Sequence, residues 1–256
     1  MTTVGLLYPG EMGVLVAAAC RADVIWASAG RSDATLARAE TLGLTDAGTL
    51  AELVARSDIV LSICPPAIAE ETAREVAAAG FDGLYVDANA ISPARAKRIA
   101  ALFGRPVDGS IVGRETIHLY LSGDPGGMDE VAALFDPAQL VALPLAGGIG
   151  AASAMKVAFA SWNKIGIALA AQSHALARAW GLEEALAAEG IEPRGVVRAG
   201  GRAWRWVAEM EEIGDTFAEV GLPDGIARGA AELYARWDEH RDTDVPLEQL
   251  LDDLRE

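Results

Sequence analysis

A glycine-containing run near the N-terminus, Val4–Gly13, has the residue types and spacing that bind a pyrophosphate. Gly10 lets the backbone approach the phosphates closely, and Gly13 lets the following helix pack against the preceding strand. That helix also offers free N–H groups and the positive end of its dipole to an anion. Tyr8 stands where the G-x-G-x-x-G pattern has its first glycine, so an ordinary strand-to-helix turn stays open as the alternative. We predict that a dinucleotide contacts Tyr8, Pro9, Gly10, Glu11 and Met12.

The segment after the second expected strand indicates which dinucleotide binds. In NAD-binding proteins an acidic residue usually ends this strand and accepts hydrogen bonds from the ribose. The segment Trp26–Ser32 contains no carboxylate, and Ser28, Arg31 and Ser32 offer hydroxyls and a guanidinium instead. That set suits the 2′-phosphate of NADPH. The alternatives are a solvated loop arginine at Arg31 and a helix-capping role for Ser32.

Lys156 has the chemistry needed to move a proton. It lies between Met155 and Val157 in an apolar helical stretch, where a lysine is costly unless it faces a wet cleft or an anion. Desolvation lowers the pKa of a lysine and makes it a usable proton donor or acceptor near neutral pH. Asn163, two helical turns on, could orient substrate or water from the same face. The alternatives are a lysine that extends along the surface to solvent and an asparagine that forms a helix–helix contact.

The elements that must position these residues alternate between strands and helices in the first half of the chain. Short apolar runs predict strands at 3–7, 24–27, 59–63, 84–87, 106–111, 116–122 and 140–143, and helices are predicted between them. Continuous apolar strands separated by helices indicate a parallel sheet covered on both faces, which is a Rossmann-type doubly wound α/β domain. From Gly147 onward Ala, Leu and Glu dominate, and 148–180 is predicted to form one long helix. We expect a dinucleotide-binding domain at 1–145 and an all-α substrate and dimerisation domain at 146–256.

Composition narrows the class of protein. The 256 residues are 52% hydrophobic, enough for a sizeable core, and carry a formal net charge of −16, which makes nucleic acid a poor partner. The two cysteines, Cys20 and Cys64, suggest buried thiols, and the three histidines lack metal-ligand spacing, so we expect no metal site. The N-terminus does not resemble a signal peptide, and the apolar stretch 146–180 is interrupted by charged and polar residues. We therefore expect a cytoplasmic protein that does not enter the membrane.

Several segments, taken in order, resemble the β-hydroxyacid dehydrogenase and 6-phosphogluconate dehydrogenase superfamily. They are similar to its glycine turn, its loop beside the nicotinamide, its next strand end, its substrate segment and its glycine-and-lysine helix: Pro9–Gly13, Ile63–Pro66, Val86–Pro93, Val107–Gly113, and Gly147–Gly150 followed by Lys156. Gly30–Ser32 and the helix from Lys156 to Lys164 are most similar to a subgroup of this superfamily. That subgroup has a NAD-binding domain of 6-phosphogluconate dehydrogenase type and an uncharacterised C-terminal domain.

The resemblance implies an NADPH-dependent oxidoreductase that transfers hydride between nicotinamide and a small hydroxy acid, keto acid or related carbonyl compound. It implies that Lys156 handles the proton and that the cofactor also contacts Cys64, Pro65, Pro66 and Asn89. The substrate is expected to be a small molecule, either neutral or anionic. It is expected to bind at Ser110, Ile111, Val112, Gly113, Arg114 and Asn163. The family also implies a homodimer, in which helices of both subunits often help form the active-site cleft.

Three positions depart from the family pattern. Val112 stands where Ser is usual, Arg114 where a second glycine is usual, and Ala160 where the family has an asparagine. Arg114 could bind an anionic substrate through a charge-assisted hydrogen bond, or it could be a surface arginine. An imine reductase stays open as an alternative, although those enzymes tend to carry Asp or Tyr in the lysine region. A non-catalytic NADPH-binding protein is the other alternative.

Overall fold

The computed structural model describes residues 2–113 and 116–255. The chain forms two compact units, Met1–Lys156 and Val157–Glu256, here called the sheet unit and the helical unit. The division falls inside the long helix α7 (Ala151–Ala179), beyond the boundary at Leu145 expected from composition. It falls there because the first turn of α7 is hydrogen-bonded to strands of the sheet unit.

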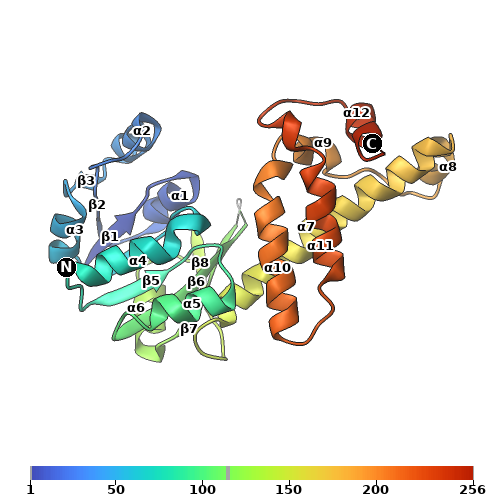
Figure 1. The fold of residues 1–256 in the computed structure, drawn as a ribbon. Helices are drawn as coiled ribbons and strands as arrows, with labels where there is room; N and C mark the ends of the chain where they lie inside the picture. Colours follow the sequence, from blue (N-terminus) through green and yellow to red (C-terminus); the bar gives the residue numbers. More distant parts are fainter. Residues whose placement is uncertain (1, 114–115, 256) are drawn as a thin grey trace. The chain divides into compact units, whose positions relative to one another are not determined.

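The sheet unit is built on an eight-stranded sheet in the order β3-β2-β1-β4-β5-β6-β7-β8 (Figure 1). Its strands are β1 (Thr3–Leu7), β2 (Asp23–Trp26), β3 (Thr45–Asp46), β4 (Ile59–Ser62), β5 (Leu84–Asp87), β6 (Arg105–Val112), β7 (Ile117–Gly123) and β8 (Leu140–Pro144). All neighbouring strands pair in parallel except β6 and β7. This topology confirms the predicted Rossmann-type α/β fold.

Two details of the sheet differ from the sequence prediction. Val112 and Ile117 are too close in the chain for a parallel crossover, which takes roughly a dozen residues or more. β6 and β7 therefore pair antiparallel, with Ser110 opposite Tyr120. β3 was not predicted, because its two residues, Thr45 and Asp46, are too few to show a hydrophobic pattern.

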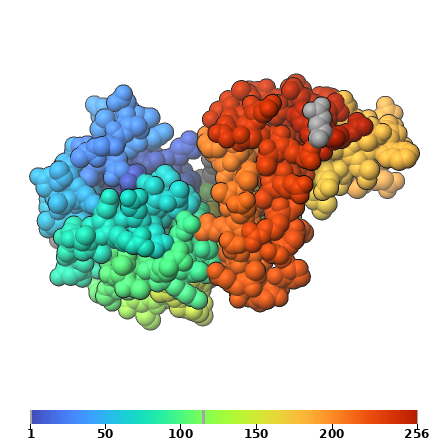
Figure 2. Space-filling view, in the orientation of Figure 1, coloured from blue at the N-terminus to red at the C-terminus, as the bar shows by residue number. Residues whose placement is uncertain are grey.

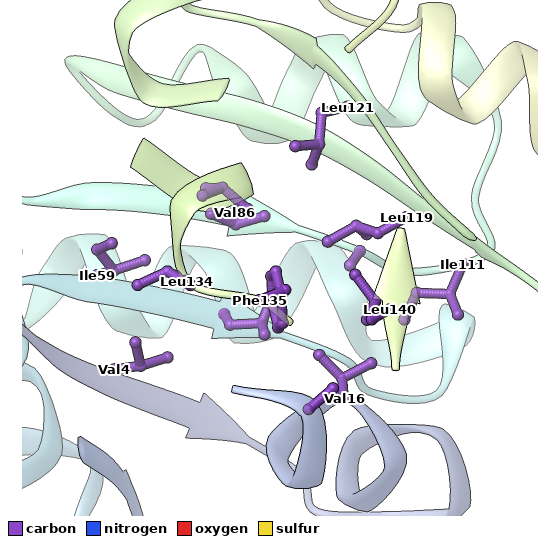
Figure 3. Packing of buried hydrophobic residues seen from close by; sticks show 14 of the residues in the cluster. Val4, Val16, Ile59, Val86, Ile111, Leu119, Leu121, Leu134, Phe135 and Leu140 are labelled. Atoms are coloured by element: carbon purple, nitrogen blue, oxygen red, sulfur yellow. The ribbon is translucent and has the colours of Figure 1, made fainter. Parts of the chain in front are cut away.

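Helices cover both faces of the sheet. They are α1 (Glu11–Ala19), α2 (Asp33–Thr41), α3 (Leu50–Arg56), α4 (Ala69–Ala78), α5 (Pro93–Ala100) and α6 (Pro125–Ala133), with a 3₁₀ turn η1 at Pro66–Ile68. Successive strand residues alternate between two cores, as Leu61 and Val60 do. The core that contains Leu61 packs against α1 and α6, and Figure 3 shows Val16 and Phe135 within it. The other core packs against α3, α4 and α5.

Local sequence sets where several helices begin. Thr49 and Glu52 form a reciprocal capping box at the start of α3. α5 and α6 each begin with proline, whose fixed φ and missing N–H suit the first helical position. Asp124 completes the start of α6 by accepting a hydrogen bond from the Gly127 N–H at 2.6 Å. These devices fix the helix ends that follow the strands.

The helical unit is organised around α7. Its other helices are α8 (Glu183–Ala188), α9 (Val196–Gly200), α10 (Val207–Glu219), α11 (Gly225–Ala235) and α12 (Leu247–Asp253), with 3₁₀ turns η2 (Ala203–Arg205) and η3 (Asp238–His240). α10 and α11 lie side by side (Figure 1), and their side chains form one continuous surface (Figure 2). Tyr234 and Trp237 are fully buried in its core, and the Trp237 indole donates to the Leu250 carbonyl at 2.9 Å. Within the described residues, no helix combines the length and apolar character needed to cross a membrane.

Candidate active site

The turn after β1 has the backbone geometry of an anion site. Gly10 precedes the first residue of α1, and no side chain of a described residue caps that helix end. The Gly10 N–H donates to the Tyr8 carbonyl at 2.6 Å. A Cβ at Gly13 would lie 2.8 Å from that same carbonyl oxygen, whereas a Cβ at Gly10 would meet nothing closer than 3.9 Å. The backbone is therefore tight where helix and strand meet and open where a pyrophosphate would approach, so these residues fit a dinucleotide.

The loop after β2 brings Arg31 onto the first turn. The Arg31 guanidinium carbon lies 3.6 Å from the centroid of the Tyr8 ring. Ser28 anchors the loop, because its carbonyl accepts from the Arg31 N–H at 3.1 Å. Ser32 precedes α2, and its hydroxyl forms a hydrogen bond with the Thr35 hydroxyl at 3.1 Å. Ser28, Arg31 and Ser32, which are predicted to select the cofactor, thus lie in one loop at the same end of the sheet as the glycine turn.

Asp46 is a carboxylate at this loop that sequence reasoning missed. One of its oxygens accepts from the Ser28 N–H at 3.2 Å and from the Gly48 N–H at 2.7 Å. The hydrogen bond from the Ser28 side chain and then that from the Gly48 N–H lower the pKa of Asp46 below its ordinary value. The only sequence signal was an Asp two positions before a glycine, a common turn pattern.

The loop after β4 is tied to the end of β5 by Asn89. The Asn89 side-chain oxygen accepts from the Cys64 N–H at 2.6 Å, and its amide donates to Ser62 at 3.1 Å and to Asp87 at 3.0 Å. Asn89 is buried, whereas Pro65 and Pro66 are exposed at the loop surface. Burial raises the pKa of Cys64 to about 11, so this residue is a neutral thiol. Its position agrees with the buried structural thiol expected from sequence.

The end of β6 meets Lys156. The Lys156 ammonium donates to the Ile111 carbonyl at 2.7 Å. Ser110, Ile111 and Val112 are buried, so this segment offers its backbone to the site. The Ser110 hydroxyl is buried and finds no hydrogen-bond partner among the described residues.

A buried carboxylate holds the first turn of α7 in place. Asp108 on β6 accepts from the Gly150 N–H, the Ser153 N–H and the Ser122 hydroxyl, each at 3.0 Å, and from the Ser153 hydroxyl at 2.6 Å. The Ser122 hydroxyl in turn accepts from the Ala152 N–H at 3.0 Å. These bonds satisfy N–H groups that a helix start leaves unpaired. We call Asp108, Ser122 and Ser153 the α7 clamp; it fixes the helix end that carries Lys156.

Sheet topology explains why these groups gather. β1, β2, β4, β5 and β6 are mutually parallel, so their carboxyl ends share one edge. The glycine turn, the Arg31 loop, the Cys64 loop and Asn89 all follow strands at that edge. The hydrogen bond to the Ile111 carbonyl places the Lys156 ammonium at the same edge. In open α/β sheets, ligands bind in the crevice outside the carboxyl ends of the strands.

Comparison with known proteins gives matches in sequence and in fold. Residues 177–237, within the helical unit, match the domain of unknown function DUF1932. No curated protein sequence matches the chain. The structure is similar to that of MTH1747, a conserved protein of unknown function with structural similarity to 3-hydroxyacid dehydrogenases. That match has 26% identity and a TM-score of 0.72 and covers 93% of this chain and 97% of that one.

Two further structures share the fold at lower identity. Mycobacterium tuberculosis 3-hydroxyisobutyrate dehydrogenase, solved with L-serine, has 19% identity and a TM-score of 0.75 over 100% of both chains. A variant of the imine reductase from Myxococcus stipitatus, solved with NAD⁺, has 18% identity and a TM-score of 0.56, also over 100% of both chains.

The chain therefore resembles 3-hydroxyacid dehydrogenases in fold. The resemblance inferred from five sequence segments is thereby confirmed, and the uncharacterised C-terminal domain expected for the subgroup corresponds to DUF1932.

The structure gives no contact between Lys156 and two of the predicted substrate residues that could test their roles. Asn163 belongs to the helical unit, and its amide donates to the Phe159 carbonyl at 2.8 Å, one turn back along its own helix. Arg114 lies outside the described residues. Their roles in substrate binding stay predictions, while the contact between Lys156 and the predicted segment 110–113 is a feature of the structure.

Proposed function

We propose that this protein is an NADPH-dependent oxidoreductase that moves hydride between nicotinamide and a small hydroxy acid, keto acid or related carbonyl compound. The observation that carries the proposal is the position of Lys156. Its ammonium is bonded to the Ile111 carbonyl at the carboxyl edge of the sheet. The open glycine turn follows β1 at that same edge. A proton-transfer group and a dinucleotide cradle on one edge are what hydride transfer to or from a carbonyl requires.

The residues that would hold the cofactor follow from the strand order. The turn 8–12 would take the pyrophosphate at the start of α1, and the loop with Ser28, Arg31 and Ser32 would take the adenosine 2′-phosphate. Cys64, Pro65 and Pro66, fixed by Asn89, would lie beside the nicotinamide ring. When bound, nicotinamide supplies the hydride donor or acceptor. The chain's own residues then have to orient the substrate and handle the proton.

In the oxidation direction Lys156 would act as the neutral amine and take up the hydroxyl proton, and in the reduction direction it would act as the ammonium and donate that proton. The hydrogen bond to the Ile111 carbonyl holds the Lys156 side chain beside the segment expected to bind the substrate. A protonated lysine also attracts a carboxylate, which supports a hydroxy acid or keto acid as substrate. The backbone of 110–113 would line the substrate position beside it.

Substitution of Lys156 tests this role. Lys156→Ala should lower kcat at least about a hundredfold, because general acid–base groups typically contribute that much, while NADPH affinity stays within about twofold. Lys156→Arg keeps the charge but transfers a proton poorly, so it should show a loss of similar size. The matched control is Lys97→Ala, at an exposed lysine on α5. Unchanged turnover in Lys156→Ala would remove Lys156 from the mechanism.

The fold shared with an imine reductase supports a second candidate activity, reduction of a carbon–nitrogen double bond. A panel of small keto acids, hydroxy acids, ketones and cyclic imines, followed by NADPH fluorescence, separates the two. Turnover restricted to imines would favour the second candidate. Binding of NADPH without turnover of any compound would favour a non-catalytic NADPH-binding protein.

We also propose a homodimer, supported by an apolar stripe on α7. Its positions recur at alternating steps of three and four residues, and the last lies just past the helix end: Phe159, Trp162, Gly166, Leu169, Ser173, Leu176 and Trp180. Trp162 is 84% exposed and Leu176 is 65% exposed, although both are large apolar side chains. This 3.5-residue period is the pattern that pairs one helix with another, and Gly166 would allow close approach. A second copy offers the same stripe, so the face is self-complementary.

A further inference from the structure

The Tyr8 backbone has a conformation that tyrosine rarely adopts. Its φ angle is +62°, in the left-handed region that favours glycine. The turn imposes this conformation, because the Tyr8 carbonyl accepts from Gly10 and leaves no room for a Cβ at Gly13. Glycine would meet the backbone requirement without strain. A strained residue of this kind points to a task for its side chain.

The Tyr8 ring has one such task in the structure, which is to support Arg31. The guanidinium carbon lies 3.6 Å from the ring centroid, so the planar group lies against the aromatic face. The contact joins the loop after β1 to the loop after β2, at the edge where the cofactor would bind. It therefore fixes a long side chain that would otherwise sample many rotamers.

Arg31 has no charge partner in the part of the chain that the structure describes. Its Nε atom is buried and lacks a hydrogen-bond acceptor among the described residues, and none of their carboxylates forms an ion pair with it. Asp46, the carboxylate at the same loop, is already engaged by the Ser28 and Gly48 N–H groups. A preformed guanidinium with unused donors suits a phosphate monoester, which accepts from the planar fork in a bidentate manner.

We infer that Tyr8 is a specificity-determining residue, whose ring holds the Arg31 guanidinium in position for the 2′-phosphate of NADPH. The inference rests on the proposed NADPH dependence and deepens it. Because NADH lacks the 2′-phosphate, loss of the ring weakens NADPH and leaves NADH nearly unchanged. Because the ring acts through Arg31, its contribution disappears when Arg31 is absent.

The test is a double-mutant cycle on the full chain, with NADPH and NADH affinities measured by nicotinamide fluorescence and 2′,5′-ADP used as a competing probe. Tyr8→Gly, which suits the positive φ angle, should weaken NADPH and 2′,5′-ADP about five- to thirtyfold and change NADH less than about twofold. Tyr8→Phe keeps the ring and should bind like the wild type. In the Arg31→Ala background, Tyr8→Gly should have little further effect on NADPH.

The outcomes separate this inference from the proposed function. If Arg31→Ala lowers the preference for NADPH while Tyr8→Gly keeps it, Tyr8 is not a specificity-determining residue and the NADPH assignment stands. If the wild type binds neither coenzyme, or Arg31→Ala weakens both equally, the proposed 2′-phosphate site is wrong and the inference fails with it. Thermal unfolding of each variant confirms that it is folded.

Discussion

At the residue scale, Asp87 carries the clearest electrostatic signature. It lies at the end of β5, is 3% exposed, and accepts hydrogen bonds from the backbone and side chain of Asn89. Burial, the largest cause, raises the pKa of Asp87 to about 7, and the Asn89 hydrogen bonds oppose that rise. The neighbouring Asp108 carboxylate raises it further. Asp87 therefore changes protonation near neutral pH, directly beside the residue that fixes the Cys64 loop.

Asp87 should make the protein less stable as pH rises towards neutrality. Its pKa is about 7 when folded and near the ordinary 3.8 when unfolded, so the folded state binds the proton more tightly. The resulting stabilisation is complete below about pH 4 and is lost as pH rises through 7. Since one pKa unit corresponds to about 1.4 kcal/mol, the free energy of unfolding should fall by a few kcal/mol.

Denaturant unfolding at pH 5, 6, 7 and 8 measures this effect. Asp87→Asn should flatten the pH dependence, because an amide does not titrate. Asp129→Asn, at an exposed aspartate on α6, should keep the slope of the wild type. Equal slopes in Asp87→Asn and the wild type would mean that Asp87 is ionised throughout this range.

Residue types near a strand end were enough to predict which loops gather at the carboxyl edge of the sheet, but not how their side chains are engaged. Gly10, Arg31 and Lys156 could be selected because their chemistry is unusual for their local sequence. Asp46 and Asp108 could not, because an aspartate is common and their partners come from other elements. Ser153, for example, is 45 positions from Asp108. The stacking of Arg31 on Tyr8 likewise depends on two loops that only the folded sheet brings together.

At the element scale, the α7 clamp connects the sheet to the helix that carries Lys156. Removing its carboxylate leaves the Gly150 and Ser153 N–H groups and two hydroxyls without their buried acceptor. Unsatisfied buried groups of this kind are costly, so Asp108→Ala should lower the free energy of unfolding by about 3 kcal/mol. Ser153→Ala removes one hydroxyl bond and should cost about 1 kcal/mol.

Chemical denaturation measures these losses, with Ser161→Ala as the matched control. Ser161 lies on the same helix, and within residues 2–113 and 116–255 its hydroxyl donates only to the Ala158 carbonyl. The control should therefore change stability by less than about 0.5 kcal/mol. If Asp108→Ala were as mild as Ser161→Ala, the clamp would not hold the start of α7.

The helices and strands agree with the sequence prediction where the apolar pattern spans enough residues to be recognised. The strand at Thr3–Leu7 was predicted from a short apolar run, and the long helix α7 from a stretch in which Ala and Leu dominate. β3 escaped because it is too short, and the antiparallel β6–β7 pair depends on a short connection rather than on strand composition.

At the scale of the whole molecule, the stripe on α7 predicts the oligomeric state. Leu169 is 64% exposed in the centre of the stripe, next to a groove of about 900 Å³ that Trp162 and Ile226 also line. A charge at this position would be desolvated by a partner helix, so Leu169→Glu should convert a dimer into a monomer at micromolar concentration. Val220→Glu, at an apolar residue of similar exposure off the stripe, should remain dimeric.

Light scattering coupled to size-exclusion chromatography gives the molar mass of both variants and the wild type. A wild type that is monomeric at micromolar concentration, or a Leu169→Glu variant that stays dimeric, would contradict pairing through α7. The stripe is visible in the sequence as spacing, but only the structure shows that Trp162, Leu169 and Leu176 are exposed on it.

The whole chain carries a net charge of −16, so an anionic coenzyme needs a local positive site, which we propose to be Arg31. The most direct test is a fluorescence titration of the wild type and Arg31→Ala with NADPH and with NADH. The wild type should bind NADPH at least about tenfold more tightly than NADH, and Arg31→Ala should remove most of that difference. Absence of binding by either coenzyme at millimolar concentration, or equal weakening of both in Arg31→Ala, would contradict the account.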